Sequence, residues 1–289
     1  MRILYTTDWH LSDRKPDSRT DVDFVAIQLA KIAEVFEIAE TNKVDIIYHG
    51  GDLFDKGRTS LHIVNKIVPF FKKNKIPFEC IIGSHDIIGY NINSLPYTGL
   101  GNLLANGYVK LLTKSDIAMG FNCSTVPRVP KGEGSKIIVA HELISPTPLP
   151  FLYITLEEVA KENPNAFVFC GHYHKPFMKQ VGKTFFFNPG PLVRTSIDEK
   201  DIKPSVVYID TDAKTFEFKA LKCAKLGNDV FAVDKANERK LQEDEFQKFI
   251  DEVRQKFKEI NVEQIVRELA KAQGLDKEVI DVSISLLQE

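Results

Sequence analysis

The sequence predicts a layered α/β fold followed by a small helical C-terminal region. Short runs rich in isoleucine, valine, tyrosine and phenylalanine recur along the first part of the chain, as is typical of interior strands. Stretches with apolar residues at helical spacing separate the early runs, so the order is strand, helix, strand, helix, strand. From about residue 236 the pattern changes to charged amphipathic helices.

Each predicted strand of the first part stops at turn residues or at charged residues. These strands cover residues 3–5, 44–48, 78–82, 137–140 and 166–170. Helices are predicted at 21–42 and at about 60–75, where Pro69 should end or kink the second helix. Later strands are predicted at 185–187, 205–209 and 215–221, with a hairpin turn at 210–214.

A domain boundary is predicted near residue 233. Residues 234–289 carry a net charge of −4, whereas residues 1–233 carry +2. In the tail, helices are predicted at 262–273 and 277–288, and one apolar stripe at helical spacing comprises Phe246, Ile250, Val253, Phe257 and Ile260. Such a stripe either packs on its own domain or docks onto a partner. We therefore predict a core at 1–233 and a helical region at 234–289.

The composition is typical of a soluble globular protein, with 289 residues, 43% hydrophobic and 27% charged. The net charge of −2 excludes a global basic field, so any phosphate binding must be local. Cys80, Cys123, Cys170 and Cys223 form no CxxC pair, which favours buried free thiols over disulfides or a thiolate metal site. The N-terminus is not a signal peptide and no apolar run could span a membrane, so we expect a cytoplasmic protein without a membrane partner.

Residue types that bind metals follow directly after each of the five early strands. These five ends read Asp8-Trp9-His10, Gly50-Gly51-Asp52-Leu53-Phe54-Asp55, Gly83-Ser84-His85-Asp86, His141-Glu142 and Gly171-His172-Tyr173-His174. Five of the seven histidines of the chain lie here. Functional residues of layered α/β folds gather at the carboxyl edge of the sheet. Because residues i and i+2 of an extended segment point the same way, Asp8 with His10, and His172 with His174, can each present two ligands to one point.

Carboxylate and imidazole groups without cysteine suit Mn²⁺, Fe²⁺ or Zn²⁺ with five or six ligands, rather than a structural zinc. The alternative is ordinary turn chemistry, since aspartate beside glycine and a single histidine at a strand end are common in turns. Five successive strand ends of this kind favour the metal site. His49 fits a supporting position behind the Gly-Gly-Asp turn, whereas His62 fits a solvated position on a helix.

The sequence resembles the calcineurin-like metallophosphoesterase superfamily in the order of five patterns: D-x-H, G-D-x-x-D, G-S-H-D, a lone H and G-H-x-H. The family has asparagine in place of the serine of the third pattern. Within it, GGDLFD at 50–55 and FNPGPLVRTS at 187–196 resemble the SbcD-type nucleases of double-strand-break repair, including their phage recombination-nuclease relatives. A protein-phosphatase relative would carry GDYVDRG and GNHE instead. The resemblance covers residues 1 to about 200 and implies a metallophosphoesterase-type layered fold, with a central β-sandwich flanked by helices.

The resemblance also implies roles for the strand-end residues. Asp8, His10, Asp52 and His174 would hold one divalent metal, and Asp52 would bridge to a second one held by Ser84, His141 and His172. Mn²⁺ is favoured, with Mg²⁺, Fe²⁺ or Zn²⁺ as alternatives. His85 would meet the leaving oxygen, and Asp86 would orient the ring of His85.

Ser84 departs from the family pattern, which has asparagine at this position. A serine hydroxyl is shorter than an amide and, when neutral, a poorer donor to a hard cation. We therefore expect weaker or more selective occupancy of the second metal position, and not its absence.

A DNA substrate follows mainly from the resemblance, which implies 3′-to-5′ exonuclease action on duplex ends and endonuclease action on single strands. Candidate DNA contacts are Lys56, Arg58, Lys131, Lys175, Lys179 and Arg194, although scattered lysines are usually only solvated. The resemblance further implies a homodimer and an SMC-like ATPase partner in a bacterial or phage-infected cell, with 234–289 as a reduced cap or docking helices. The rival functions are a small-substrate phosphodiesterase and a non-catalytic scaffold.

Overall fold

The computed structural model describes residues 1–112, 117–121 (backbone only), 128–131 and 136–232, together with isolated positions between 248 and 281. The chain divides into two compact units, Met1–Val233 and Asp234–Glu289. In the second unit Ile250 is helical, while the other four residues of the predicted apolar stripe lie outside the described residues. The functions expected of the two units stay predictions.

In the first unit, two large sheets face each other. The first sheet has the strand order β13 (Thr215–Ala220), β12 (Ser205–Asp210), β1 (Arg2–Thr6), β2 (Ile46–His49), β3 (Phe78–Cys80) and β4 (Lys110–Leu111). The second has the order β10 (Phe177–Val181), β11 (Thr184–Asn188), β9 (Phe167–Gly171), β6 (Ile137–His141) and β5 (Ile117–Phe121). In the first sheet β1, β2 and β3 run parallel, and in the second β6 and β9 do, so their carboxyl ends share an edge within each sheet.

Alternation along the strands builds the core between the sheets. In β1, Ile3 and Tyr5 face the second sheet while Leu4 faces the helices, as expected for a side-chain period of two. The inter-sheet core also includes Ile46, Tyr48, Val139, Phe169, Phe187, Val207 and Ile209. Because both faces of the central strands are covered, these strands read as nearly continuous apolar runs.

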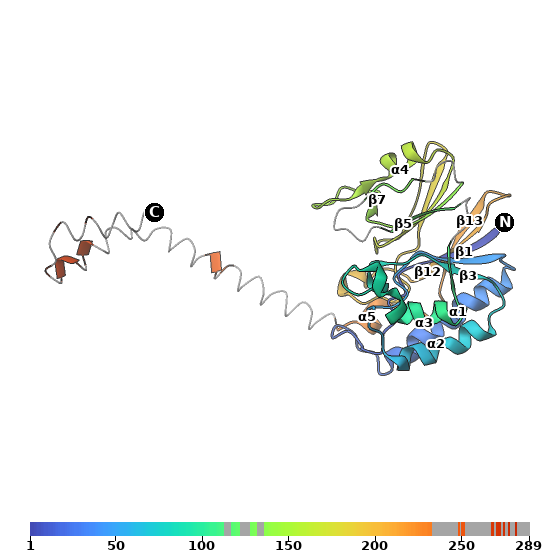
Figure 1. Cartoon of the computed structure of the whole chain (residues 1–289), viewed down its shortest axis with the longest axis horizontal. Coiled ribbons are helices and arrows are strands. Elements are labelled where there is room, and N and C mark those ends of the chain that lie inside the picture. The colour runs from blue at the N-terminus through green and yellow to red at the C-terminus, as the bar shows by residue number, and fades with distance from the viewer. Residues whose placement is uncertain are drawn as a thin grey trace. The chain divides into compact units, whose positions relative to one another are not determined.

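Helices cover the outer faces of the two sheets. In Figure 1, α1 (Phe24–Thr41), α2 (Leu61–Lys73) and α3 (Gly99–Ala105) lie on the side of the first sheet, and α4 (Leu156–Glu162) lies beside the second. The two-stranded sheet of β7 (Ile144–Ser145) and β8 (Ile154–Thr155) joins the cluster around α4. The short helices η1 (Ser84–Asp86), η2 (Ile92–Tyr97), η3 (Ile197–Glu199) and α5 (Gly227–Val230) lie in connections.

The layered α/β fold with a central sandwich is confirmed, and the structure adds two details. Helix α2 continues past Pro69 to Lys73, so the proline does not end it. Pro69 and Asn65, whose carbonyl loses its helical donor to the proline, are both exposed, so water can satisfy that carbonyl. The five metal-type strand ends belong to the carboxyl edges of two sheets rather than one.

Candidate metal centre

Loops after strands of both sheets meet at the candidate centre. The loop after β1 pairs with the loop after β2, because the amides of Asp8 and His10 donate to the carbonyls of Gly51 (3.1 Å) and Asp52 (3.0 Å). The loop after β3 approaches so closely that a Cβ on Gly83 would lie 2.1 Å from Asp52 Oδ1. Glycine at position 83 is therefore required by this contact.

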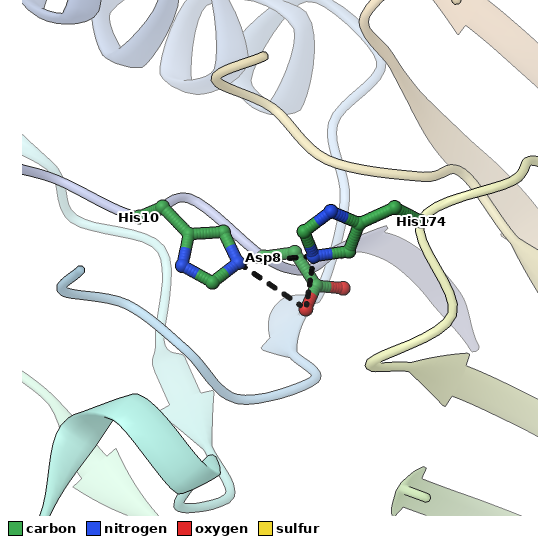
Figure 2. Close-up of side chains that lie close together, drawn as sticks. All are labelled: Asp8, His10 and His174. Atoms are coloured by element: carbon green, nitrogen blue, oxygen red, sulfur yellow. Dashed lines mark hydrogen bonds and ion pairs between the residues drawn. The ribbon is translucent and has the colours of Figure 1, made fainter. Parts of the chain in front are cut away.

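Asp8, His10 and His174 form the first candidate ligand group. The Nε2 atoms of His10 and His174 are 3.1 Å apart, and they lie 3.8 Å and 3.6 Å from Asp8 Oδ1. Figure 2 shows both rings turning a nitrogen toward the Asp8 carboxylate. The side chain of Asp8 is buried and is fixed by hydrogen bonds from the amide of His172 and the hydroxyl of Thr7.

Asp52, His141 and His172 form the second group, and Asp52 also reaches the first. Asp52 Oδ2 lies 3.1 Å from His141 Nε2 and 3.9 Å from His10 Nε2. Its other oxygen, Oδ1, accepts a hydrogen bond from the amide of His85 at 2.7 Å. One ligand atom from each of Asp52, His141 and His172 lies within 4.8 Å of the others, as is also true of the first group. The Asp52 carboxylate therefore lies between the two groups.

Two histidines are held with Nε2 facing the centre. His174 Nδ1 lies 2.5 Å from Glu199 Oε1, and His141 Nδ1 lies 2.8 Å from the carbonyl of Gly50. Since a carboxylate and a carbonyl can only accept, each Nδ1 donates a proton to its partner, and Nε2 is the nitrogen that faces the centre, where a bound cation would displace any proton on it. Sequence reasoning missed Glu199, although its place in the Ser-x-x-Glu capping box of η3 was visible in the sequence.

The backbone is strained at the candidate ligands. Among the described residues, eight non-glycine positions have a positive φ, and four of them are Asp8 (50°), His10 (44°), Asp52 (55°) and His172 (75°). Such conformations cost about 1–3 kcal/mol each and cluster at functional sites. The surrounding structure therefore holds the backbone of these four residues in an unfavourable conformation, which sets the directions of their side chains.

Charge coupling keeps the carboxylates of the centre ionised. Burial alone would lower the pKa of His174 and His141, but carboxylate contacts raise these values to about 10 and about 9. Burial likewise would raise the pKa of Asp8 and Asp52, yet hydrogen bonds and charge from the histidines hold both below the ordinary value. Two buried carboxylates that remain charged among imidazole nitrogens suit divalent cations.

His85 extends over the edge of the centre. His85 is exposed, and its Nδ1 lies 2.6 Å from the carbonyl of Asp55, so Nδ1 is the donor. One ligand-type atom of His85 lies within 4.8 Å of those of His10 and Asp52. The ring thus lies beside the centre, and the carbonyl of Asp55 fixes its orientation.

Comparison with known proteins gives the family. Residues 1–214 match the calcineurin-like phosphoesterase superfamily domain, which is well over half of the chain. The chain belongs to the calcineurin-like phosphoesterase superfamily. In this superfamily the centre is a dinuclear site for divalent metals, and the two groups joined by Asp52 supply donors that fit one.

Curated relatives of this superfamily member support its SbcD/Mre11-type branch. A DNA double-strand break repair protein Mre11 from Methanosarcina mazei is 26% identical over 223 residues, covering 70% of this chain and 35% of the relative. An Mre11 protein from Saccharolobus solfataricus is 29% identical over 154 residues, covering 50% and 38%. The SbcD component of nuclease SbcCD from Escherichia coli is 29% identical over 91 residues, covering 30% and 22%. The chain thus spans only about a fifth to two fifths of the length of these relatives.

The prediction that Asp86 orients the ring of His85 is wrong. The carboxylate of Asp86 is buried and accepts hydrogen bonds from the amides of Gly83 (2.9 Å) and Phe54 (3.1 Å). Neighbouring residues of a 3₁₀ turn point about 120° apart, so His85 and Asp86 diverge in η1. Burial and the charge of Asp52 raise the pKa of Asp86 to about 7. Asp86 ties the loops after β2 and β3 together.

Ser84 lies between Gly83, which packs closely against Asp52, and His85, whose amide donates to Asp52. The side chain is half-buried, and within the described ranges its hydroxyl makes no hydrogen bond. Ser84 and His85 both line a cleft beside the centre. The position is therefore next to the second group, and its expected role as a metal ligand stays a prediction.

Arg194 is not available to DNA, contrary to the prediction. Its side chain is buried, and its guanidinium donates to the carbonyls of Lys200, Ile202 and Lys225. Because the buried guanidinium already donates to three carbonyls, it cannot turn outward to contact a phosphate. Arg194 holds the loop after β11 to the segment before α5.

The other candidate DNA contacts are exposed. Lys131 pairs with Glu162 at 3.7 Å, and Lys175 and Lys179 are solvated. Lys56 and Arg58 line two clefts of about 410 Å³ and 340 Å³ that flank their loop, and only the smaller one includes His85. Binding of DNA by any of these side chains stays a prediction.

His49 lies behind the turn after β2, where its Nδ1 accepts a hydrogen bond from the amide of Gly51 at 3.2 Å. Burial lowers its pKa to about 3, so the ring is neutral. Of the cysteines, Cys80 and Cys170 are buried free thiols; Cys223 is free but exposed, contrary to the prediction, and Cys123 lies outside the described residues. None of the helices in the described ranges is long and apolar enough to cross a membrane.

Proposed function

We propose that this protein is a two-metal nuclease that hydrolyses phosphodiester bonds of DNA. The observation that carries the proposal is the position of Asp52, whose Oδ2 lies 3.1 Å from His141 Nε2 and 3.9 Å from His10 Nε2. One carboxylate between two groups of imidazole nitrogens is the arrangement that a bridged pair of cations requires. Membership of the calcineurin-like phosphoesterase superfamily supports this reading of the geometry.

Each half of the centre supplies its own donors. Asp8, His10 and His174 with Asp52 would hold one metal, and Asp52 with Ser84, His141 and His172 would hold the other. When bound, two divalent cations would polarise a phosphodiester and supply a water of lowered pKa. The mixture of oxygen and imidazole donors favours Mn²⁺ over Mg²⁺, while Fe²⁺ and Zn²⁺ also suit it.

His85 would act on the leaving oxygen. The hydrogen bond from Nδ1 to the carbonyl of Asp55 fixes the ring and leaves Nε2 to hold or release a proton at the substrate. Because the ring is exposed, it can meet a polymer that approaches from solvent. The amide of His85 also donates to Asp52 Oδ1, which ties the position of the ring to the bridging carboxylate.

A DNA substrate is supported by the names of the relatives and by the basic residues near the centre. Two relatives are named for DNA double-strand break repair and one is named as part of a nuclease. Arg14 and Lys15 join Lys56 and Arg58 in the larger cleft, where phosphates could be positioned. We propose 3′-to-5′ exonuclease action on duplex ends and endonuclease action on single strands. The net charge of −2 makes the affinity for DNA alone low and dependent on salt.

Weak affinity for DNA favours further subunits. We propose a homodimer that works with an SMC-like ATPase in the cytoplasm, with residues 234–289 as the docking region. Light scattering of the purified chain tests the dimer, and a double mass would support it. Co-purification with the ATPase, lost on deletion of 234–289 but not after substitution of His85, tests the docking region.

The nuclease is tested with end-labelled duplex DNA and circular single-stranded DNA, each with Mn²⁺, Mg²⁺ or a chelator. We expect cleavage with Mn²⁺, none with chelator, and a loss of about 10²- to 10⁴-fold in His85→Ala. His62→Ala is the matched control, because His62 is exposed on α2 and is not among the ligand groups at the centre.

Two outcomes would replace this proposal by its rivals. Hydrolysis of bis-(p-nitrophenyl) phosphate with both DNA substrates left intact would indicate a small-substrate phosphodiesterase. The absence of metal-dependent hydrolysis of any substrate, with no effect of His85→Ala, would indicate a non-catalytic scaffold.

A further inference from the structure

A cleft of about 340 Å³ opens beside His85. Three segments line it: the loop after β2, the start of η1, and the turn that follows η1. The lining side chains of interest are Lys56, Arg58, Ser84, His85, Ile88 and Tyr90. The cleft combines two cations, one aromatic ring and the residue proposed to meet the leaving oxygen. Its size is at the lower end of the range for small-ligand sites, about 300–1,000 Å³, and suits a single nucleotide rather than a duplex.

Tyr90 occupies an unusual backbone conformation at the tip of a tight turn. The amide of Asn91 donates to the carbonyl of Ile88 at 3.1 Å, and the two residues between them have φ values of 58° (Gly89) and 57° (Tyr90). Positive φ at both central positions is the pattern of a type I′ turn, in which asparagine and glycine are usual. A bulky tyrosine in this conformation is strained, and strain of this kind points to a function for the side chain.

The turn that carries Tyr90 is braced at its base. The hydroxyl of Ser94 accepts from the amide of Ile88 at 2.8 Å and donates to the carbonyl of Asn91 at 2.6 Å. Ile87, which precedes the turn, is buried. The ring of Tyr90 is nevertheless 56% exposed. A ring that is exposed on a fixed support loses little freedom when a flat ligand stacks on it.

The loop with the two cations packs against the same turn. A Cβ on Gly57, which lies between Lys56 and Arg58, would be 2.7 Å from the backbone carbonyl of Ile87. Lys56 and Arg58 are both exposed. The loop and the turn therefore meet closely at Gly57 and Ile87, while the side chains on either side of this contact point are free to bind a ligand in the cleft.

We propose that this cleft binds one unpaired nucleotide adjacent to the scissile phosphate, with its base stacked on Tyr90 and its phosphate beside Lys56 and Arg58. The proposal rests on the proposed nuclease function, since it names how the substrate of that site is held. Stacking on an aromatic ring accepts any base, so the subsite favours unpaired ends and single strands without selecting a sequence. A base within a duplex cannot stack there, so the terminal pair must open first.

Small substrates with and without a base test the subsite. The 3′- and 5′-(p-nitrophenyl phosphate) esters of thymidine carry a base, whereas bis-(p-nitrophenyl) phosphate does not. We expect Tyr90→Asn to raise KM for at least one thymidine ester roughly tenfold and to leave bis-(p-nitrophenyl) phosphate unchanged. Asparagine suits the left-handed conformation, so this variant removes the ring while keeping the turn. Tyr90→Phe should retain the wild-type KM.

Tyr97→Ala is the matched control, because Tyr97 is 82% exposed and does not line the cleft. Binding of a single-stranded oligonucleotide with terminal 2-aminopurine, measured by fluorescence quenching in chelator, gives a readout without catalysis. Quenching should fall in Tyr90→Asn and persist in Tyr97→Ala.

Three results would overturn the subsite. The first is an unchanged KM for both thymidine esters in Tyr90→Asn. The second is a rise in KM for bis-(p-nitrophenyl) phosphate equal to that for the thymidine esters. The third is a lower mass of Tyr90→Asn than of the wild type in light scattering, which would show that the ring of Tyr90 serves self-association. If the wild type hydrolyses neither kind of ester with any metal, the proposed nuclease function fails, and the subsite fails with it.

Discussion

The two halves of the candidate centre differ in how completely the chain builds them. The first half has Asp8, His10 and His174, and a carboxylate, Glu199, holds the ring of His174 from behind. The second half shares Asp52, has only a main-chain carbonyl behind the ring of His141, and has Ser84 where the family has asparagine. From this difference we infer that the first position, completed by Asp52, would bind its metal more tightly than the second.

Substitution of Asp52 should have the largest effect, because Asp52 is the one side chain that both halves use. We expect Asp52→Asn to lower Mn²⁺ affinity at both positions, and to lower activity by more than the roughly 100-fold typical of losing a supporting contact. Isothermal titration with Mn²⁺ and hydrolysis of bis-(p-nitrophenyl) phosphate measure the two effects. Asp45→Asn is the matched control, since Asp45 pairs with Arg2 on the surface. Loss at a single position only would show that Asp52 does not bridge.

Substitution of Glu199 should weaken the first half selectively. We expect Glu199→Ala to lower Mn²⁺ affinity about 10- to 100-fold at the first position, because His174 loses the acceptor that fixes its Nδ1 proton. Ser196→Ala is the control: the hydroxyl of Ser196 caps the same turn but is not bonded to His174. Equal losses in Glu199→Ala and Ser196→Ala would mean that η3 matters only for folding.

Restoring asparagine at position 84 should strengthen the second half. We expect Ser84→Asn to tighten the weaker Mn²⁺ site roughly tenfold, about 1.4 kcal/mol, while the tighter site is unchanged. Titration of the wild type and of Ser84→Asn over a range of Mn²⁺ concentrations resolves the two sites. Identical titrations would show that Ser84 does not limit the second position.

Substitution of Lys31 should change folding stability rather than metal affinity, so it has the smallest effect on the centre itself. Its Nζ donates to the carbonyl of Leu192 at 2.7 Å, and the amide of Leu192 donates to the carbonyl of Asp8. Burial, together with the charges of Arg19 and Arg194, lowers the pKa of Lys31 from 10.5 to about 7. Between these values the unfolded chain holds a proton that the folded chain has lost, so stability rises with pH.

We therefore expect wild type to gain stability relative to Lys31→Met between pH 7 and 10, by at most about 1.4 kcal/mol per pH unit. Urea unfolding followed by the fluorescence of Trp9, the single tryptophan of the chain, measures the difference at each pH. A difference that is independent of pH would show that Lys31 keeps its ordinary pKa in the folded protein.

The sequence predicted the strands and the residues at their ends well, because both depend on local patterns. A short apolar run such as Ile3-Leu4-Tyr5 indicates a buried strand, and the polar residues that follow it indicate where the strand ends. Residues that act through contacts distant in sequence were harder to predict. Glu199 meets His174 across 25 positions, and Arg194 is buried by carbonyls up to 31 positions away.

The directions of side chains within a turn were equally hard to predict from the sequence. Asp86 follows His85 directly, yet the 3₁₀ geometry of η1 sends it toward Phe54 and Gly83 instead. Helix α3 was missed because Gly99 and Gly101 lower its helical propensity, while burial of Leu100 and Leu103 stabilises it.

Anomalous scattering from crystals soaked in Mn²⁺ tests the bridging position of Asp52 most directly. We predict two peaks about 3.5–4 Å apart, one on each side of the Asp52 carboxylate, with the peak near Ser84 the weaker of the two. No peak beside Asp52, or a single ion bound by Asp8, His10 and His174 without contact to Asp52, would contradict the account.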